Sequence, residues 1–167
     1  MLRKILLIVL VVITILWTAF IFSNSLDNAE QSTEKSSTVT EIVNTVASAV
    51  GVEEEIPHST VRDMAHFTEF AILAFLICAD LALALVAPHP RKPLRYVLCP
   101  ACSLTLSFVL ACVDELLQKS AEGRAAQFSD VLLDTLGALT GTVFFCICYL
   151  CAFLIKRKKS RSTVDTE

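Results

Sequence analysis

Four long apolar runs constrain the fold of this chain more than any other feature, because each is long enough to cross a bilayer. An α-helix rises about 1.5 Å per residue, so a run of about 20 residues spans the roughly 30 Å hydrocarbon core. Backbone groups in lipid must pair within their own segment, so the runs are predicted to be helices. The 167-residue chain, 54% hydrophobic, is therefore predicted to be all-α, a polytopic membrane protein with a four-helix transmembrane bundle. The runs are about 5–22, 67–87, 94–113 and 131–155.

The first run follows Arg3 and Lys4 and is either a retained anchor or a cleaved signal peptide. Its apolar stretch is longer than the roughly 7 to 15 residues of most signal peptides, and no A-x-A cleavage site follows it. We therefore expect it to be retained as the first transmembrane helix.

The distribution of basic residues predicts the orientation of the bundle. They cluster before the first run, between the second and third, and after the fourth, whereas the other two loops are poor in them. By the positive-inside rule, both termini are predicted to be cytoplasmic. The basic tail is explained as an orientation signal and a disordered anchor to anionic lipid, so no nucleic-acid partner is predicted. We expect a cytoplasmic N-terminus (1–4), a membrane domain (5–155) with outside loops 23–66 and 114–130, and a basic cytoplasmic tail (156–167).

The first outside loop is predicted to contain a helix with a modest apolar stripe. Val39, Ile42 and Val46 recur at helical spacing, Ser32 or Thr33 could cap the helix, and Gly51 could end it. Such a helix either lies flat in the interface or packs over the mouth of the bundle. We favour the mouth, because the aromatic and lysine anchors of surface-lying helices are missing.

Polar side chains are predicted to meet at the outside end of the bundle. They lie at the outer ends of the second and third helices, at the start of the fourth, and in the loop between the third and fourth. His66 and Glu69 are three residues apart, and Asp130 and Asp134 are four apart, so each pair shares a helix face. Gln118 likewise shares a face with Asp114 and Glu115, which precede it by four and three residues. The candidates for ligand binding are Arg62, His66, Glu69, Asp114, Glu115, Gln118, Arg124, Asp130 and Asp134.

The fourth helix is expected to turn the face that carries Asp134 into the bundle. Gly137 and Gly141 continue this face and would allow another helix to approach closely. A carboxylate that faced lipid would be costly, which favours the same orientation.

Two interpretations of these nine polar residues remain open. Arg124 could bridge carboxylates in a clasp that only holds the helices together. Alternatively the cluster forms a pocket that binds a headgroup or performs acid–base chemistry, with Arg124 holding an anionic group. The candidate proton-transfer groups are His66, Glu69, Asp114 and Glu115. A bound divalent cation could also hold these acids together, but no tight metal-ligand motif is present, so no metal or other cofactor is predicted.

Other polar groups lie deeper in the predicted bundle. Asp80 is eleven residues after Glu69 and either reaches the inner membrane surface, caps a neighbouring helix, or belongs to a proton path. Cys99-x-x-Cys102 and Cys148-x-x-Cys151 match redox or zinc spacing. We interpret these cysteines as small hydrophobic residues, because no further ligand accompanies them.

Several motifs together resemble those of the VanZ-like family of bacterial membrane proteins. They are Phe22-Ser23, Arg62-x-x-x-His66-Phe67-x-Glu69-Phe70, Asp114-Glu115-x-x-Gln118, Arg124, Ser129-Asp130 and Asp134-x-x-Gly137-x-x-x-Gly141. The chain departs from the family pattern at Ser25, Asp63 and Phe70, where the family often has Gln, Lys and Tyr. The resemblance implies a multi-pass protein of the bacterial cytoplasmic membrane that is associated with reduced susceptibility to teicoplanin-type glycopeptide antibiotics.

These observations support three functional hypotheses. The favoured one is binding of a lipid or glycolipid headgroup, such as a lipid-linked cell-wall precursor or the glycopeptide itself. The alternative is a membrane enzyme that acts on a lipid-linked envelope substrate by acid–base chemistry, although no familiar hydrolase motif is present. A transporter is the third, and Asp80 is the one deep charge that supports it.

Overall fold

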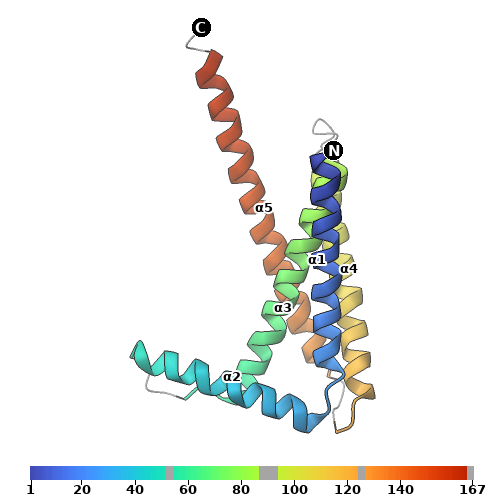
Figure 1. Ribbon diagram of the computed structural model, residues 1–167, viewed down its shortest axis with the longest axis vertical. Coiled ribbons are helices and arrows are strands. Elements are labelled where there is room, and N and C mark those ends of the chain that lie inside the picture. Colours follow the sequence, from blue (N-terminus) through green and yellow to red (C-terminus); the bar gives the residue numbers. More distant parts are fainter. Residues whose placement is uncertain (52–54, 87–93, 124–126, 165–167) are drawn as a thin grey trace.

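The chain folds into helices connected by short segments (Figure 1). The computed structural model describes residues 1–51, 55–86, 94–123 and 127–164. Four of its helices are long and apolar enough to cross a membrane, which confirms the predicted all-α class and the four spans. The elements are α1 (Leu2–Ser25), α2 (Ala29–Ala49), α3 (His58–Leu81) continued by the π-helical η1 (Ala82–Val86), α4 (Leu94–Ser120) and α5 (Phe128–Val164).

The spanning helices pack most closely near the end that carries α2. There α5 crosses α3, and it leans away from α1 and α4 toward its own C-terminal end (Figure 1). The apolar core of the bundle is small and consists of Ile21, Phe70, Leu73, Ile77, Ala111 and Val131. Most other large apolar side chains are exposed, as expected for residues that face lipid rather than water.

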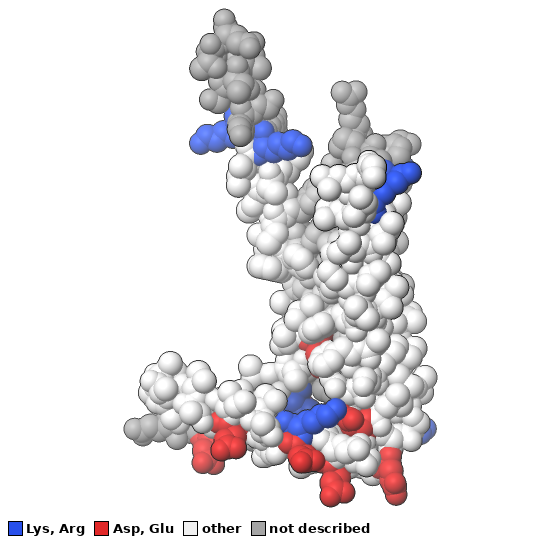
Figure 2. All heavy atoms as spheres, in the orientation of Figure 1, with Lys and Arg blue, Asp and Glu red and all other residues white. Residues whose placement is uncertain are grey.

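Charged side chains are separated along the long axis of the molecule. Acidic residues gather at the α2 end together with some basic ones, and basic residues mark the opposite end, near the start of α1 and on the far part of α5 (Figure 2). Between them lies an apolar band. This separation is the pattern on which the orientation rule relies, and the cytoplasmic location of the termini stays a prediction.

Helix α2 lies across one end of the bundle and begins earlier than the sequence suggested (Figure 1). The prediction of a Ser32 or Thr33 cap was wrong: Asn28 is the N-cap, and it forms a reciprocal capping box with Gln31. At the other end Gly51 has φ +89°, a conformation that favours glycine after a helix.

Contacts with the start of α3 hold α2 in place. The hydroxyl of Thr40 lies 3.1 Å from Nδ1 of His58, and the side chain of Asn44 bonds to both backbone groups of Ile56. The apolar residues Val39, Ile42 and Val46 stay largely exposed. Helix α2 is therefore fixed by polar contacts and leaves an apolar stripe accessible to lipid.

Helix α3 begins at His58 after Pro57, whose fixed φ suits this position. One further expectation about a helix end was wrong. The predicted disordered tail is helical as far as Val164, because α5 continues without a break. Residues 88–93, which include three prolines, lie outside the described residues.

Candidate functional site

Buried polar side chains from all four spanning helices meet near the α2 end of the bundle. Helix α1 contributes Ser25, α3 contributes His66, α4 contributes Asp114 with Glu115 and Gln118, and α5 contributes Asp134. We call these six residues the polar cluster. All but the half-buried His66 are buried, and each lies near the end of its helix.

Asp114 is fully buried, with none of its surface exposed, and its two carboxylate oxygens accept different hydrogen bonds. The hydroxyl of Ser25 donates to Oδ1 at 2.5 Å. The amide of Gln118, one turn later on α4, donates to Oδ2 at 2.8 Å. These two bonds fix the orientation of the carboxylate and connect α1 to α4.

Asp134 and His66 face each other across the contact between α5 and α3. Oδ1 of Asp134 lies 3.9 Å from Nδ1 of His66, and the Asp134 side chain is only 1% exposed. Among the described residues, neither carboxylate oxygen of Asp134 has a hydrogen-bond partner. A buried carboxylate without hydrogen bonds is costly, so Asp134 must either carry a proton or lie beside a cation.

Glu115 and Asp130 both lie at the hairpin between α4 and α5. Oε1 of Glu115 accepts a hydrogen bond from the backbone N–H of Gln127, which immediately precedes α5. Asp130 lies in the first turn of α5, where a negative charge is favoured by the helix dipole, and accepts a bond from Ser129. Both residues therefore help to hold this helix end.

Glu69 lies beside the polar cluster on α3, close enough to Asp114 to interact electrostatically with it. Nδ2 of Asn24 donates to its Oε1 at 3.3 Å, and the indole of Trp17 donates to its backbone carbonyl at 3.0 Å. Glu69 also lines a mostly apolar groove of about 330 Å³ between α1, α2 and α3, with Phe20 and Val43. It thus stands between this groove and the buried cluster.

Gly137 and Gly141 lie where α5 crosses α3. A Cβ atom at Gly137 would lie 2.2 Å from the carbonyl oxygen of Phe67, and one at Gly141 would lie 1.9 Å from that of Ala71. Any side chain here would push the helices apart. The close approach carries Asp134, one turn before Gly137, toward His66.

Some of the residues predicted for the site lie elsewhere. Arg62 is exposed near the start of α3, and among the described residues no ion pair joins it to the cluster. Arg124, the expected counter-charge, lies outside the described residues. Asp80 lies deeper, where it accepts a 2.8 Å hydrogen bond from Thr14 and so connects α3 to α1.

Ser25 and Asn24 were not predicted as site residues, yet both bond to acids of the site. The available signal was their position: two polar residues end the first apolar run at the depth of the predicted cluster.

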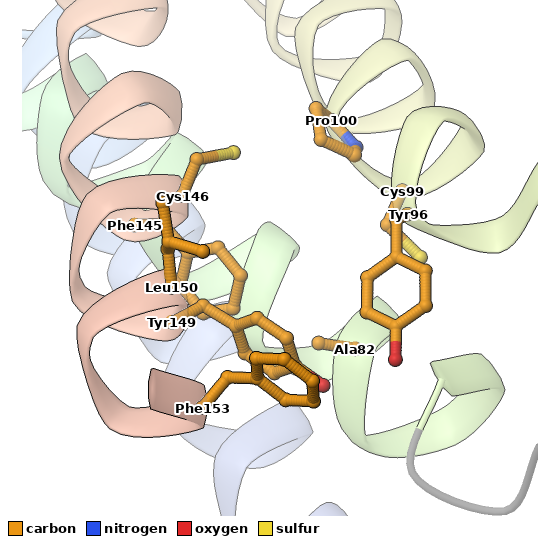
Figure 3. A pocket seen from close by; sticks show the side chains of 9 residues that line it. All are labelled: Ala82, Tyr96, Cys99, Pro100, Phe145, Cys146, Tyr149, Leu150 and Phe153. Carbon is orange, nitrogen blue, oxygen red and sulfur yellow. The ribbon is translucent and has the colours of Figure 1, made fainter. Parts of the chain in front are cut away.

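A separate cavity of about 470 Å³ lies at the opposite end of the bundle, between α4, α5 and the end of α3 (Figure 3). Its walls carry aromatic and sulfur side chains, including Tyr96, Tyr149 and Cys99, and among its described lining residues none is charged. All seven cysteines are free thiols. The lining of this cavity therefore suits an apolar chain.

Comparison with known proteins bears on the same residues. The family model described as VanZ/LLP1 matches residues 10–149, a segment that includes the whole polar cluster and most of all four spans. No curated protein and no solved structure matches the chain. The family match covers far more than half of the sequence, and the chain belongs to the VanZ/LLP1 family of membrane proteins.

Proposed function

We propose that this protein binds the headgroup of a lipid or glycolipid at the α2 end of its bundle. The observation that carries the proposal is the convergence of buried polar side chains from four helices near one membrane surface. Polar groups at this depth are costly, so their concentration in one place favours a function. The ligand would be a lipid-linked cell-wall precursor or a lipid-bearing glycopeptide.

The groove beside Glu69 supports an amphipathic ligand. Its apolar wall, which includes Trp17 and Phe20, suits an acyl or prenyl chain, and Glu69 offers a carboxylate at its edge. Carboxylates accept hydrogen bonds from sugar hydroxyl and amino groups. In this proposal Arg62, Arg124 and Asp130 contact the outer part of the headgroup, and Arg124 holds its phosphate.

In its biological setting, the protein would lie in the bacterial cytoplasmic membrane with the polar cluster facing outward. Occupying or sequestering a lipid-linked ligand there would lower susceptibility to teicoplanin-type antibiotics. The VanZ/LLP1 membership and the charge separation along the bundle support this setting.

Lipid binding by purified protein tests the proposal. Protein in detergent would be titrated with polyprenyl phosphate, with phosphatidylglycerol, and with phosphatidylcholine as the weak comparison. We expect saturable binding of an anionic lipid that falls at least tenfold in Glu69→Gln and in the double variant Arg124→Ala with Asp130→Ala. Asp80→Asn serves as the matched control, because Asp80 lies outside the cluster. Equal binding of all lipids, or no loss in the variants, would contradict the proposal.

The pairing of an imidazole with a carboxylate favours one second candidate, an enzyme acting on a lipid-linked substrate. Nδ1 of His66 and Oδ1 of Asp134 lie 3.9 Å apart, beyond the roughly 2.6–3.2 Å of a working general base and its orienting acid, so the two side chains would have to move closer to act as such a pair. Mass spectrometry of polyprenyl-linked substrates after incubation would reveal turnover. Product formation that disappears in His66→Gln would favour an enzyme. Substrate that stays unchanged would favour the binding proposal.

A further inference from the structure

Three donor atoms in the polar cluster are arranged as the ligands of a metal ion would be. One nitrogen of His66, one oxygen of Asp114 and one oxygen of Asp134 all lie within 4.8 Å of one another. They come from α3, α4 and α5. No short sequence motif could reveal this site, because its three donors are far apart in the chain and meet only in the fold.

The state of Asp134 points to a ligand that the protein itself does not provide. The side chain is 1% exposed and faces His66, and neither of its oxygens has a hydrogen-bond partner among the described residues. Asp114 is buried beside it, and no described Lys or Arg pairs with either carboxylate. Two buried carboxylates with no basic partner among the described residues are strongly destabilising unless a proton or a cation neutralises them.

The chemistry of the donors selects the class of cation. Imidazole with carboxylates suits zinc and other first-row divalent ions, whereas magnesium and calcium prefer oxygen ligands alone. Zinc bonds of about 2.0–2.2 Å place tetrahedral ligands roughly 3.4 Å apart. The 3.9 Å between His66 and Asp134 is thus within a small side-chain adjustment of a bound geometry.

Neighbouring residues already hold one ligand in position. Ser25 and Gln118 donate to the two oxygens of Asp114. Metal-binding carboxylates are usually oriented by such outer hydrogen bonds, whose loss weakens metal affinity by about 10–100-fold. Each oxygen keeps a further lone pair that could face a cation.

We propose that His66, Asp114 and Asp134 bind one first-row divalent cation, with zinc as the representative ion. Three protein ligands leave a coordination position open, as in zinc sites that bind a further small ligand. That position could accept a phosphate oxygen of the headgroup, and this last step alone rests on the proposed function. The cation also removes the repulsion between the acids and an anionic headgroup.

Cobalt titration of purified, chelator-treated full-length protein in detergent tests the proposal without lipid. We expect about one ion per chain, with the weak visible bands of nitrogen and oxygen ligands. Strong near-ultraviolet thiolate bands would instead place the ion on the cysteines and overturn the proposal. Metal content measured after dialysis against zinc provides an independent stoichiometry.

Variants identify the ligands. His66→Ala and Asp134→Asn should each lower cobalt affinity more than tenfold, and Ser25→Ala should lower it by about tenfold or more through Asp114. Asp80→Asn, the same substitution deeper in the bundle, should bind as wild type does. Circular dichroism and gel filtration check that each variant is folded, and His66 is the half-buried position at which folding is least at risk.

The results separate the two proposals. Metal binding without lipid binding would refute the headgroup proposal alone, because cobalt is measured in its absence. Wild-type affinity in both His66→Ala and Asp134→Asn, or no bound ion in wild type, would overturn the metal site whatever the lipid results show.

Discussion

Ser25, at the end of α1, donates a 2.5 Å hydrogen bond to Asp114, near the end of α4. Both side chains are buried, so the bond links the first and third membrane spans where water is largely excluded. Asp114 is also bound by Gln118, and it lies next to His66 and Asp134. This bond therefore connects the packing of α1 to the chemistry of the polar cluster.

Loss of the Ser25 hydroxyl should destabilise the bundle. Leaving a buried carboxyl oxygen without its hydrogen bond costs about 1–3 kcal/mol, so Ser25→Ala should lower the unfolding free energy by about that amount. Ser23→Ala is the matched control, because Ser23 is exposed on the same helix. Reversible unfolding in mixed micelles measures both, and equal stability of the two variants would show that the bond contributes little.

Methyl groups at the glycines of α5 should separate α5 from α3. Gly137→Ala and Gly141→Ala place a carbon too close to the carbonyl oxygens of Phe67 and Ala71, and overpacking of this kind costs about 1–3 kcal/mol. Thermal unfolding in detergent should show a lower midpoint for each. Ala152→Val, at an exposed position of α5, adds volume without a contact and should leave the midpoint unchanged. A stable Gly141→Ala would contradict the observed approach.

Thr14 and Asp80 should behave as a coupled pair. Thr14→Val removes the 2.8 Å bond to Asp80 and leaves a carboxylate in an apolar setting, with an expected loss of about 1–3 kcal/mol. The double variant Thr14→Val with Asp80→Leu should recover much of that loss, because both polar partners are then gone. A double-mutant cycle measures the coupling, and additive effects would show that the two residues act independently.

A substitution at Asp80 also tests the transporter hypothesis. If Asp80 only joins α3 to α1, then Asp80→Asn should leave resistance and lipid binding intact. Loss of either in a stable Asp80→Asn protein would revive a role for this deep charge.

The capping box should determine the stability of the first turn of α2. Asn28→Ala removes the bond to the Gln31 amide, and N-cap losses of this kind cost about 0.5–2 kcal/mol locally. Hydrogen exchange should accelerate in the amides that follow Asn28, with the rest of the bundle unchanged. Ser37→Ala, at an exposed position of the same helix, is the control. Unchanged exchange would mean that other contacts hold this turn.

The helical spans were predictable because bilayer thickness and backbone pairing leave few alternatives for long apolar runs. The level at which polar residues meet also followed from topology, which places the start of α3 and the end of α4 beside the start of α5. Helix spacing predicted that Asp114 and Gln118 share a face, and the structure joins them by a hydrogen bond.

Other features required tertiary structure. The cap of α2 was misplaced because Asn28 competes with several Ser and Thr residues that could serve equally well by sequence. The role of Ser25 in the cluster depends on how α1 is rotated against α4. Helix α1 is apolar and exposed nearly all round, so its sequence periodicity does not determine this rotation. The group of His66, Asp114 and Asp134 depends on the close crossing of α3 and α5.

Asp134→Asn tests most directly whether the polar cluster binds a ligand or only holds the helices together. The substitution keeps the shape of the side chain and removes its capacity to carry a negative charge. Melting temperature of the ligand-free protein and teicoplanin susceptibility of bacteria expressing it should be measured together. We predict a melting temperature at or above that of wild type, with the protective effect lost. A lower melting temperature with protection retained would contradict the account and leave the cluster as a structural clasp.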